Sequence, residues 1–229
     1  FDDKSLRQAI NYAIDKSAII QNVLFGAAKP ANTYLPLMAF HDDSIVGYPY
    51  DLDKAKQLVA QSAAKGGFKA TLWATAGDAV AAQVCQLVAS DLSQIGGNIT
   101  LQTEDGNANL DRVFKTRDFD MNIGYYTTDI IDPDELTGFA VQSTGGTDAV
   151  GTGYKNDAVD KLVSQAELET DKTKRQAIYT QIQQMQSDDA PFIYLYYPGG
   201  RTVTSKHIKD FNILPTGNYR LWEVWRDDA

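Results

Sequence analysis

The alternation of strand-like and helix-like segments in the central part of the chain is the feature that most restricts its fold. Residues 68–75, 99–103 and 119–126 are short, mostly apolar segments of the kind that form strands. Between the first two, apolar residues recur at helical spacing before the pair Gly96-Gly97; they are Val80, Val84, Leu87, Val88, Leu92 and Ile95. Because helical crossovers join parallel strands, this order predicts an α/β fold with a mostly parallel central sheet flanked by helices.

Helical periodicity extends over much of the remaining chain. It predicts further helices over residues 4–14 and 18–25, around 52–59, over 110–116, and around 159–166 and 178–185. Segment 27–50 has no period and is predicted as a long ordered loop, and the glycine-rich segment 143–153 as a mobile or wrapping one. Residues 192–197 resemble a compact strand. Residues 198–229 show no helical period, and they have too few apolar neighbours to bury themselves alone.

The charge balance excludes one class of partner. The chain has 30 acidic and 21 basic residues and a net charge of -9. Nucleic-acid binding needs a surface rich in lysine and arginine, so we expect no nucleic-acid partner. No apolar run approaches the roughly 18 residues of a membrane span. The first residues also lack a basic and then apolar leader, so we expect any export signal to lie upstream or to have been removed.

Metal and nucleophile chemistry has few candidate residues in this sequence. The histidines are His41 and His207, and the single cysteine is Cys85. These residues provide no zinc cluster and no clear Cys-His pair, so we expect neither a metal nor another cofactor. The side chains left for catalysis are carboxylates, serine or threonine hydroxyls and tyrosine.

Four segments resemble a known family along almost the whole chain, in order and with that family's spacing. They read FDDKSLRQAINYAIDKSAIIQNVLFGAAKPA at 1–31, YDLDKAKQLVAQSAAKGG at 50–67, ASDLSQIGGNITLQ at 89–102 and YKNDAVDKLVSQAELETDKTKRQAIYTQIQQMQSDDAPFIYLYY at 154–197. On these residues the chain resembles the C-terminal lobe of the family 5 extracellular solute-binding proteins. These are the dipeptide- and oligopeptide-binding receptors of ABC importers.

The resemblance implies a periplasmic-binding-protein-like fold of the type II "flytrap" class, in which two lobes enclose the ligand. Residues 1–197 would form the C-terminal, ligand-binding lobe, and 198–229 a return segment belonging to an N-terminal lobe that this chain lacks. The implied partners are a peptide or similar small solute, the permease subunits of an ABC transporter and that N-terminal lobe. The implied location is the periplasm or the outer face of a bacterial membrane, free or lipid-anchored. Segment 198–229 would also let the isolated chain self-associate.

The most informative polar segment is YYTTDIIDPDEL at 125–136, directly after the third predicted strand. Ligands of open α/β sheets bind beyond the carboxyl ends of strands, so this position fits a site. A helix start explains Asp132 as the N-cap and Asp134 and Glu135 as acids in the first turn. Asp129 has no such explanation. It is either a ligand contact through a charge-assisted hydrogen bond or a solvated loop acid.

Three aromatic residues, Tyr125, Tyr126 and Trp73, end predicted strands at the same edge of the sheet. Each is either part of the apolar wall of a ligand cleft or a core residue. The resemblance matches Asp129 to the family's aspartate that holds the α-ammonium of bound peptides. Some dipeptide receptors place an arginine for the peptide carboxylate at the segment that here reads ATAGDAVAA (74–82), without a basic residue. This departure favours a longer peptide, an opine-like or other cationic molecule, or a sugar.

Three classes of function fit these observations to different degrees. A non-catalytic receptor lobe agrees with the resemblance and with the lack of a nucleophile-base pair. A hydrolase would need two carboxylates from 129–135 placed across a cleft, one with a raised pKa, and this run is too exposed and crowded. An interaction module would use the aromatic segment 219–225 as its contact strip. We predict the receptor, and no enzyme.

Overall fold

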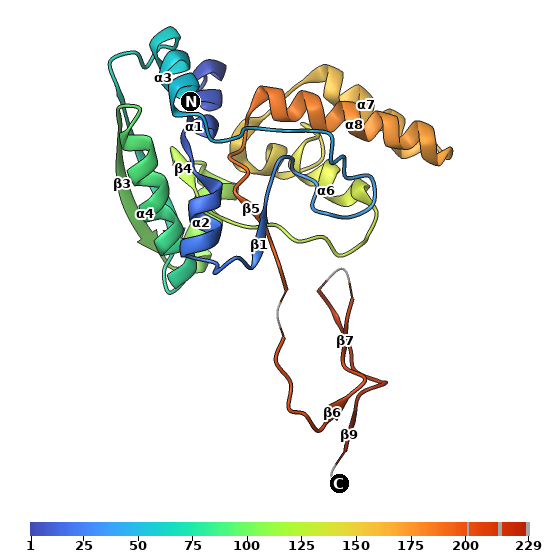
Figure 1. Cartoon of the computed structure of the whole chain (residues 1–229). Coiled ribbons are helices and arrows are strands. Elements are labelled where there is room, and N and C mark those ends of the chain that lie inside the picture. Colours follow the sequence, from blue (N-terminus) through green and yellow to red (C-terminus); the bar gives the residue numbers. More distant parts are fainter. Residues whose placement is uncertain (201, 215–216, 228–229) are drawn as a thin grey trace.

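The computed structural model describes residues 1–200, 202–214 and 217–227. In Figure 1 a group of helices packed on a small sheet lies beside a second, helical group, and a thin arm of strands leaves the body toward the C-terminus. Each of the two groups has its own hydrophobic core. We call them the first core and the second core.

A three-stranded parallel sheet forms the base of the first core. Its order is β3-β2-β4, with β2 (Phe68–Thr75) in the centre, β3 (Gly97–Glu104) on one side and β4 (Met121–Asn122) on the other. β2 and β3 pair along their whole length, from Phe68 opposite Gly97 to Thr75 opposite Glu104. The parallel sheet with its helical crossover confirms the predicted α/β class.

The third strand is shorter than predicted. β4 pairs with β2 only at Met121 and Asn122, and one further bond joins Ile123 N to Trp73 O at 2.9 Å. The prediction of a strand over 119–126 was therefore too long. The apolar residues after Ile123 leave the sheet and line a cleft instead, and residues that line a cleft show the same apolar character as a strand.

Helices cover one face of this sheet and complete the first core. They are α1 (Lys4–Ala13), α2 (Lys16–Asn22), α3 (Leu52–Gln61) and α4 (Ala79–Ser93). Alternate residues of β2, Ala70, Leu72 and Ala74, are buried in this core, whereas Thr71 and Trp73 on the other face are only partly covered. The period of two along the strand thus decides which side chains reach the core.

α4 begins where the sequence predicts. The Asp78 carboxylate caps it by accepting a hydrogen bond from Ala81 N at 2.8 Å. Val84 and Leu92 are buried, as expected from their spacing, but Val80 is 44% exposed. The expectation was wrong for Val80 because this residue lies in the first turn of α4, where it lines the cleft.

The second core forms around Tyr179, which is fully buried. The elements that build it are α6 (Pro133–Ala140), the π-helical turn η2 (Ala149–Gly153), α7 (Asp157–Leu168) and α8 (Lys172–Asp189). Ala149 and Val150 of η2 are buried, so segment 143–153 wraps this core. A short helix, α5 (Gly106–Asp111), and the turn η1 (Arg112–Thr116) lead from β3 to β4.

The chain crosses between the cores through a short antiparallel ladder. β1 (Ala28–Pro30) pairs with β5 (Tyr196–Pro198), so only the end of the predicted strand 192–197 is paired. At the start of this segment the carbonyl oxygen of Phe192 accepts a hydrogen bond from a side chain instead, the Asn11 amide Nδ2, at 3.1 Å. At the end of the ladder Gly199 N donates to Ala27 O at 2.9 Å, and a Cβ at Gly199 would lie 2.8 Å from that oxygen.

Arg7 joins α1 of the first core to the end of α8. Its guanidinium donates to the carbonyl oxygen of Asp189 at 2.8 and 3.2 Å and to that of Ala190 at 3.2 Å. It also donates to the carbonyl oxygens of Phe1 and Asp2, both at 2.9 Å. One side chain therefore satisfies carbonyl groups from two separate parts of the chain.

The arm (described residues 200, 202–214 and 217–227) consists of four very short strands in two antiparallel pairs. The pairs are β6 (Ile208–Lys209) with β9 (Trp225–Arg226) and β7 (Asn212–Ile213) with β8 (Tyr219–Arg220). Large apolar side chains are exposed along the arm; they are Val203, Ile213, Tyr219, Leu221, Trp222 and Trp225. Figure 1 shows that the arm projects from the body rather than packing over a core.

Lys16 is a buried basic residue whose ammonium group has a backbone partner. The residue is 7% exposed, and its Nζ donates to Ala31 O at 2.8 Å. Burial lowers the pKa of Lys16 to about 8, whereas a lysine in an unfolded chain has a pKa of about 10.4. The folded protein thus releases this proton at lower pH than the unfolded chain does.

This difference predicts a stability that rises with pH. Above pH 8 the unfolded chain binds more protons than the folded protein, so alkaline pH favours folding until the unfolded lysine also titrates. Between pH 8 and about 9.5 we expect the free energy of unfolding to rise by about 1.5 kcal/mol more in the wild type than in Lys16→Met. Urea titrations across this range measure the difference. Identical slopes in the two proteins would contradict the prediction.

Candidate ligand-binding cleft

A large cleft opens between the two cores. Its volume is about 2070 Å³, well above the roughly 300–1,000 Å³ of ordinary small-molecule pockets. It is lined by Thr75 at the end of β2, by Asn122 of β4, by residues that follow β4, and by segment 192–198. The cleft thus lies beyond the carboxyl ends of the parallel strands, where open α/β sheets bind ligands.

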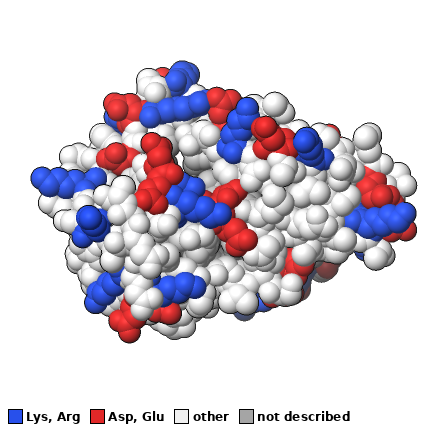
Figure 2. Space-filling model, turned by 90° about the horizontal axis from the view of Figure 1, so that it is seen from above, with Lys and Arg blue, Asp and Glu red and all other residues white. Residues whose placement is uncertain are grey.

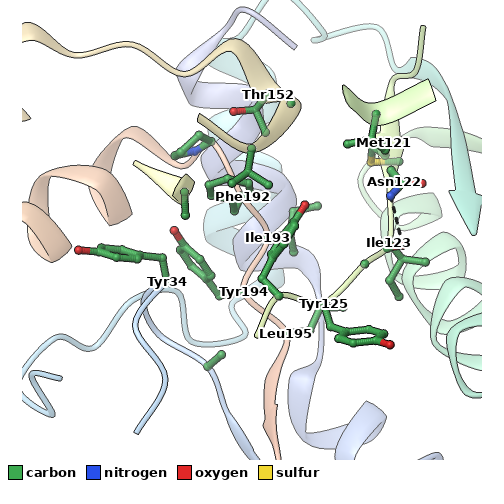
Figure 3. Close-up of a pocket in the computed structure, with 18 of the residues that line it drawn as sticks. Tyr34, Met121, Asn122, Ile123, Tyr125, Thr152, Phe192, Ile193, Tyr194 and Leu195 are labelled. Atoms are coloured by element: carbon green, nitrogen blue, oxygen red, sulfur yellow. Dashed lines mark hydrogen bonds between the residues drawn. The ribbon is translucent and has the colours of Figure 1, made fainter. Parts of the chain in front are cut away.

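The floor of the cleft is aromatic. In Figure 3 segment 192–195 runs through the centre of the view, and the ring of Tyr194 lies next to that of Tyr34. The hydroxyl of Tyr34 pairs with Thr137 Oγ1 at 2.9 Å, and that of Tyr194 donates to Gln186 Oε1. Burial raises the pKa of both tyrosines, so they stay neutral. With their hydroxyls used inside the protein, the rings give the cleft an apolar surface.

Two predicted site residues, Tyr125 and Tyr126, line the mouth of the cleft. Tyr125 is 82% exposed, and Figure 3 shows its ring pointing away from the centre of the view. The ring of Tyr126 packs on that of Phe139 in α6, with 5.5 Å between the centroids. Both lie in the loop after β4 rather than at the end of a strand.

Trp73 lies apart from them, and it is absent from the described residues that line the cleft. The guanidinium of Arg112 lies over the indole ring of Trp73, with 3.7 Å between Cζ and the ring centroid, in a cation–π contact. Arg112 in turn makes a two-point ion pair with Glu104, at 2.7 and 3.0 Å. The contact with Arg112 on the outer face of the sheet is sufficient to explain why an aromatic residue occupies position 73. A role of Trp73 in ligand binding stays a prediction.

Asp129 lies on the exposed loop between β4 and α6. Thr127 and Thr128, directly before it, line the cleft, whereas Asp129 is not among the described lining residues. Its backbone N donates to Glu135 Oε2 at 2.9 Å. The chain therefore carries Asp129 next to the cleft mouth that Tyr125 and Tyr126 line, and its contact with a ligand stays a prediction.

The start of α6 is built as its sequence predicts, with one addition. Asp132 is the N-cap and accepts a hydrogen bond from Asp134 N at 3.0 Å, with Pro133 at the first helical position. Both carboxylates also bind Arg175 of α8: Asp132 at 2.7 and 2.8 Å and Asp134 at 2.7 Å. No local pattern marks Arg175, because its partners lie more than 40 positions earlier in the chain.

Two acids of this segment, Asp132 and Glu135, have the wrong electrostatics for a general acid. Hydrogen bonds from Arg175 lower the pKa of Asp132, and a hydrogen bond from Thr128 lowers that of Glu135. A general acid in a two-carboxylate hydrolase needs a raised pKa instead. Asp132 and Glu135 therefore act as charged hydrogen-bond acceptors that stabilise the fold.

Some lining residues could not be found from sequence patterns. Tyr34 belongs to the segment without periodicity, and Arg117 follows a short helix with no motif around it. The Arg117 guanidinium pairs with Asp148 across the chain at 2.5 Å. The sequence signal near Tyr34 is the unusual length of loop 27–50, which indicates a functional or wrapping segment.

The described residues also limit other kinds of site. None of the helices they form combines the length and the apolar composition needed to cross a bilayer, and among them no group of three or more His, Cys, Asp or Glu could hold a metal ion. Figure 2 shows acidic and basic side chains interspersed over the face seen from above, without a broad basic field there. Cys85 is buried, and burial raises its pKa to about 11, so its thiol is unreactive.

The chain is similar to known bacterial solute-binding proteins. Residues 1–148 match the family described as bacterial extracellular solute-binding proteins, family 5 Middle. The chain is 30% identical over 222 residues to the heme-binding protein A of Haemophilus influenzae, covering 95% of this chain and 40% of that protein. It is 27% identical over 231 residues to the dipeptide-binding protein of Escherichia coli, covering 97% and 43%. The chain thus spans about two fifths of the length of these relatives.

Solved structures agree with the observed fold. A periplasmic binding protein of Helicobacter pylori in complex with the peptide STSA has a TM-score of 0.76 and 27% identity, over 85% of this chain and 38% of that one. A dipeptide-binding protein of Pseudoalteromonas in complex with Met-Leu has a TM-score of 0.85 over 99% and 46%, and at 23% identity it shows the fold alone. These relatives are periplasmic or extracellular solute-binding receptors. The chain belongs to the family 5 bacterial extracellular solute-binding proteins.

Proposed function

We propose that this chain is the ligand-binding lobe of a receptor that captures a peptide or related small solute and delivers it to the membrane permease of an ABC importer. The observation that carries this proposal is the large, aromatic-floored cleft beyond the carboxyl ends of β2 and β4. Relatives named for heme and for dipeptides support it. On this proposal the protein is a receptor without catalytic activity, exported to the periplasm or the outer face of the membrane, free or lipid-anchored.

We further propose that residues 1–197 form one lobe and that 198–229 belong to a second, N-terminal lobe. In support, the described part of the arm leaves both cores and exposes large apolar side chains that a partner lobe would cover. The same side chains give the isolated chain a surface for self-association. Light scattering of the isolated chain at high concentration tests the self-association. A strictly monomeric chain would contradict it.

We place the ligand's ammonium group at Asp129, with Tyr125 and Tyr126 as cleft walls. Two features support this placement: the loop holds Asp129 beside lining residues Thr127 and Thr128, and its carboxylate is exposed. Both arginines among the described lining residues are already engaged: Arg117 pairs with Asp148, and Arg7 donates to backbone carbonyl groups. A ligand whose main charge is positive therefore fits this site better than one that needs a free guanidinium.

Asp129→Asn tests this placement in the two-lobed protein that carries the sequence. A charge-assisted hydrogen bond contributes about 1.5–3 kcal/mol, so the variant should bind the tripeptide Ala-Ala-Ala about 10- to 100-fold more weakly. N-acetyl-Ala-Ala-Ala, which lacks the ammonium, should bind both proteins equally. Calorimetric titration measures both affinities. Equal binding of the free tripeptide by both proteins would remove Asp129 from the site.

Native mass spectrometry of the two-lobed protein, purified without denaturation, tests the receptor itself. A retained peptide or amino-acid conjugate supports the peptide class. A retained sugar keeps the receptor and changes Asp129 from a cation anchor to a hydroxyl acceptor. Turnover of a small solute that the protein does not retain contradicts a receptor.

A further inference from the structure

One carboxylate oxygen, Glu135 Oε2, accepts several hydrogen bonds from the loop that carries Asp129. Glu135 Oε2 accepts hydrogen bonds from Asp129 N at 2.9 Å and from Ile130 N at 3.1 Å. The Thr128 hydroxyl lies 2.8 Å from the same oxygen and 2.6 Å from Ile130 O, so its single proton is shared between two acceptors. Three consecutive residues thus turn around one side chain.

This arrangement differs from an ordinary helix cap. In a capping box, the acid at the third helical position would reach back to the backbone N–H of the N-cap residue. Here Asp132 caps α6 through Asp134 N, while the Glu135 side chain extends past the cap to residues 128–130. The hydrogen bond from Thr128 lowers the pKa of Glu135, so the carboxylate stays charged and keeps accepting at neutral pH.

The base of this turn is fixed to the second core. Arg175 of α8 holds Asp132 through two bonds and Asp134 through one, all between 2.7 and 2.8 Å. The buried Tyr179 donates its hydroxyl to Asp134 as well. A continuous set of bonds therefore runs from the core through the start of α6 to Glu135.

We infer that Glu135 is a positioning residue, whose carboxylate holds residues 128–130 in the turn that presents Asp129 to a bound cation. The inference rests on the proposed function of Asp129. Residues 129–131 are exposed and in no regular element, and among the described residues the hydrogen bonds that join residues 128–130 to α6 all end on Glu135. Without that carboxylate these three residues lose their anchor on the helix. A ligand would then have to order the loop on binding, and that ordering lowers affinity.

A direct test follows the loop itself, without a ligand. Amide hydrogen exchange, resolved by NMR, should accelerate at least tenfold for Asp129 and Ile130 in Glu135→Ala, because both amides lose their acceptor. In Glu135→Gln the remaining side-chain oxygen can still accept, so the exchange rates should lie between those of Glu135→Ala and the wild type. Glu167→Ala, at an exposed glutamate of α7, is the matched control. Unchanged exchange in Glu135→Ala overturns the inference.

The second test measures binding of Ala-Ala-Ala to the two-lobed protein. Glu135→Ala should weaken binding about tenfold, and Glu135→Gln should recover part of that loss. If Glu135 acts through Asp129, the Ala substitution should have no further effect in an Asp129→Asn background. A loss that persists in that background, or a Gln variant as weak as the Ala variant, overturns positioning in favour of direct attraction by charge.

The two failures are distinguishable. If Asp129→Asn binds the tripeptide as the wild type does, the ammonium anchor fails and the inference fails with it. If Asp129→Asn weakens binding while Glu135→Ala does not, only the inference fails. If the wild type does not bind the tripeptide, the peptide class fails, and the exchange rates alone decide whether Glu135 shapes the loop.

Discussion

Arg7→Met should lower the free energy of unfolding by about 3 kcal/mol, because it removes every donor that satisfies four backbone carbonyl groups. Methionine keeps most of the apolar stem, so the loss reports the guanidinium rather than the packing. Arg7→Lys should recover little, since a single ammonium cannot reach carbonyls on both sides of the planar fork. The expected consequence is a weaker junction between α1 and the end of α8.

Chemical denaturation monitored by tryptophan fluorescence measures this loss. Lys56→Met, at an exposed lysine of α3, is the control and should change stability by less than about 0.5 kcal/mol. Hydrogen exchange should also show earlier opening at Asp189 and Ala190 than in the wild type. If Arg7→Met is as stable as the control, the carbonyl groups have equally good partners in solvent, and Arg7 does not join the cores.

The second large effect is expected at Arg175. Arg175→Met leaves the carboxylates of Asp132 and Asp134 without their cation at the start of α6, and we expect a loss of about 1–2 kcal/mol, because both carboxylates are partly exposed and water screens the ion pairs. Asp132 has a lowered pKa in the folded protein because of Arg175. Its contribution is therefore complete above the unfolded pKa of about 3.9 and disappears as the pH falls through the lower folded pKa.

The stability gap between wild type and Arg175→Met should accordingly be widest near neutral pH and narrow below pH 4. Urea titrations at several pH values measure it. Lys174→Met, at the exposed neighbour on the same helix, provides the control. A gap that does not change with pH would mean that Arg175 stabilises the protein through its stem or its hydrogen bond to Ala166 O, and not through the two carboxylates.

The parts of the fold that sequence reasoning predicts well are those fixed by local patterns. β2, α4 and β3 follow from apolar periodicity between glycine pairs, and the caps Asp78 and Asp132 from side chains that bond their own backbone. Family resemblance supplied the expectation of a two-lobed architecture, which no local pattern contains and which stays a prediction. Local chemistry thus specifies where elements begin and end, while the sequence neighbours of a strand do not specify how far its partner extends.

The predictions that failed concern features that depend on contacts between residues far apart in the sequence. The predicted strand 119–126 pairs with β2 only at Met121 and Asn122, with one further bond from Ile123 N to Trp73 O, and the residues after Ile123 leave the sheet and line the cleft. Trp73 sits at a strand end, as expected, but its place is set by Arg112, almost 40 positions later. The carboxylates around Asp129 were expected to be caps, and Arg175 and Glu135 connect them in ways that only three-dimensional structure reveals.

The ladder between β1 and β5 has a mechanical consequence. Among the described residues beyond Gly199, the backbone hydrogen bonds of the arm are made within the arm. A load applied to the arm is therefore transmitted through three paired residues and ends at Gly199, where even a methyl group would collide with the carbonyl of Ala27. Gly199 is thus the last described residue of the arm side whose backbone is hydrogen-bonded to the body, and it is where a pull on the arm would first be resisted.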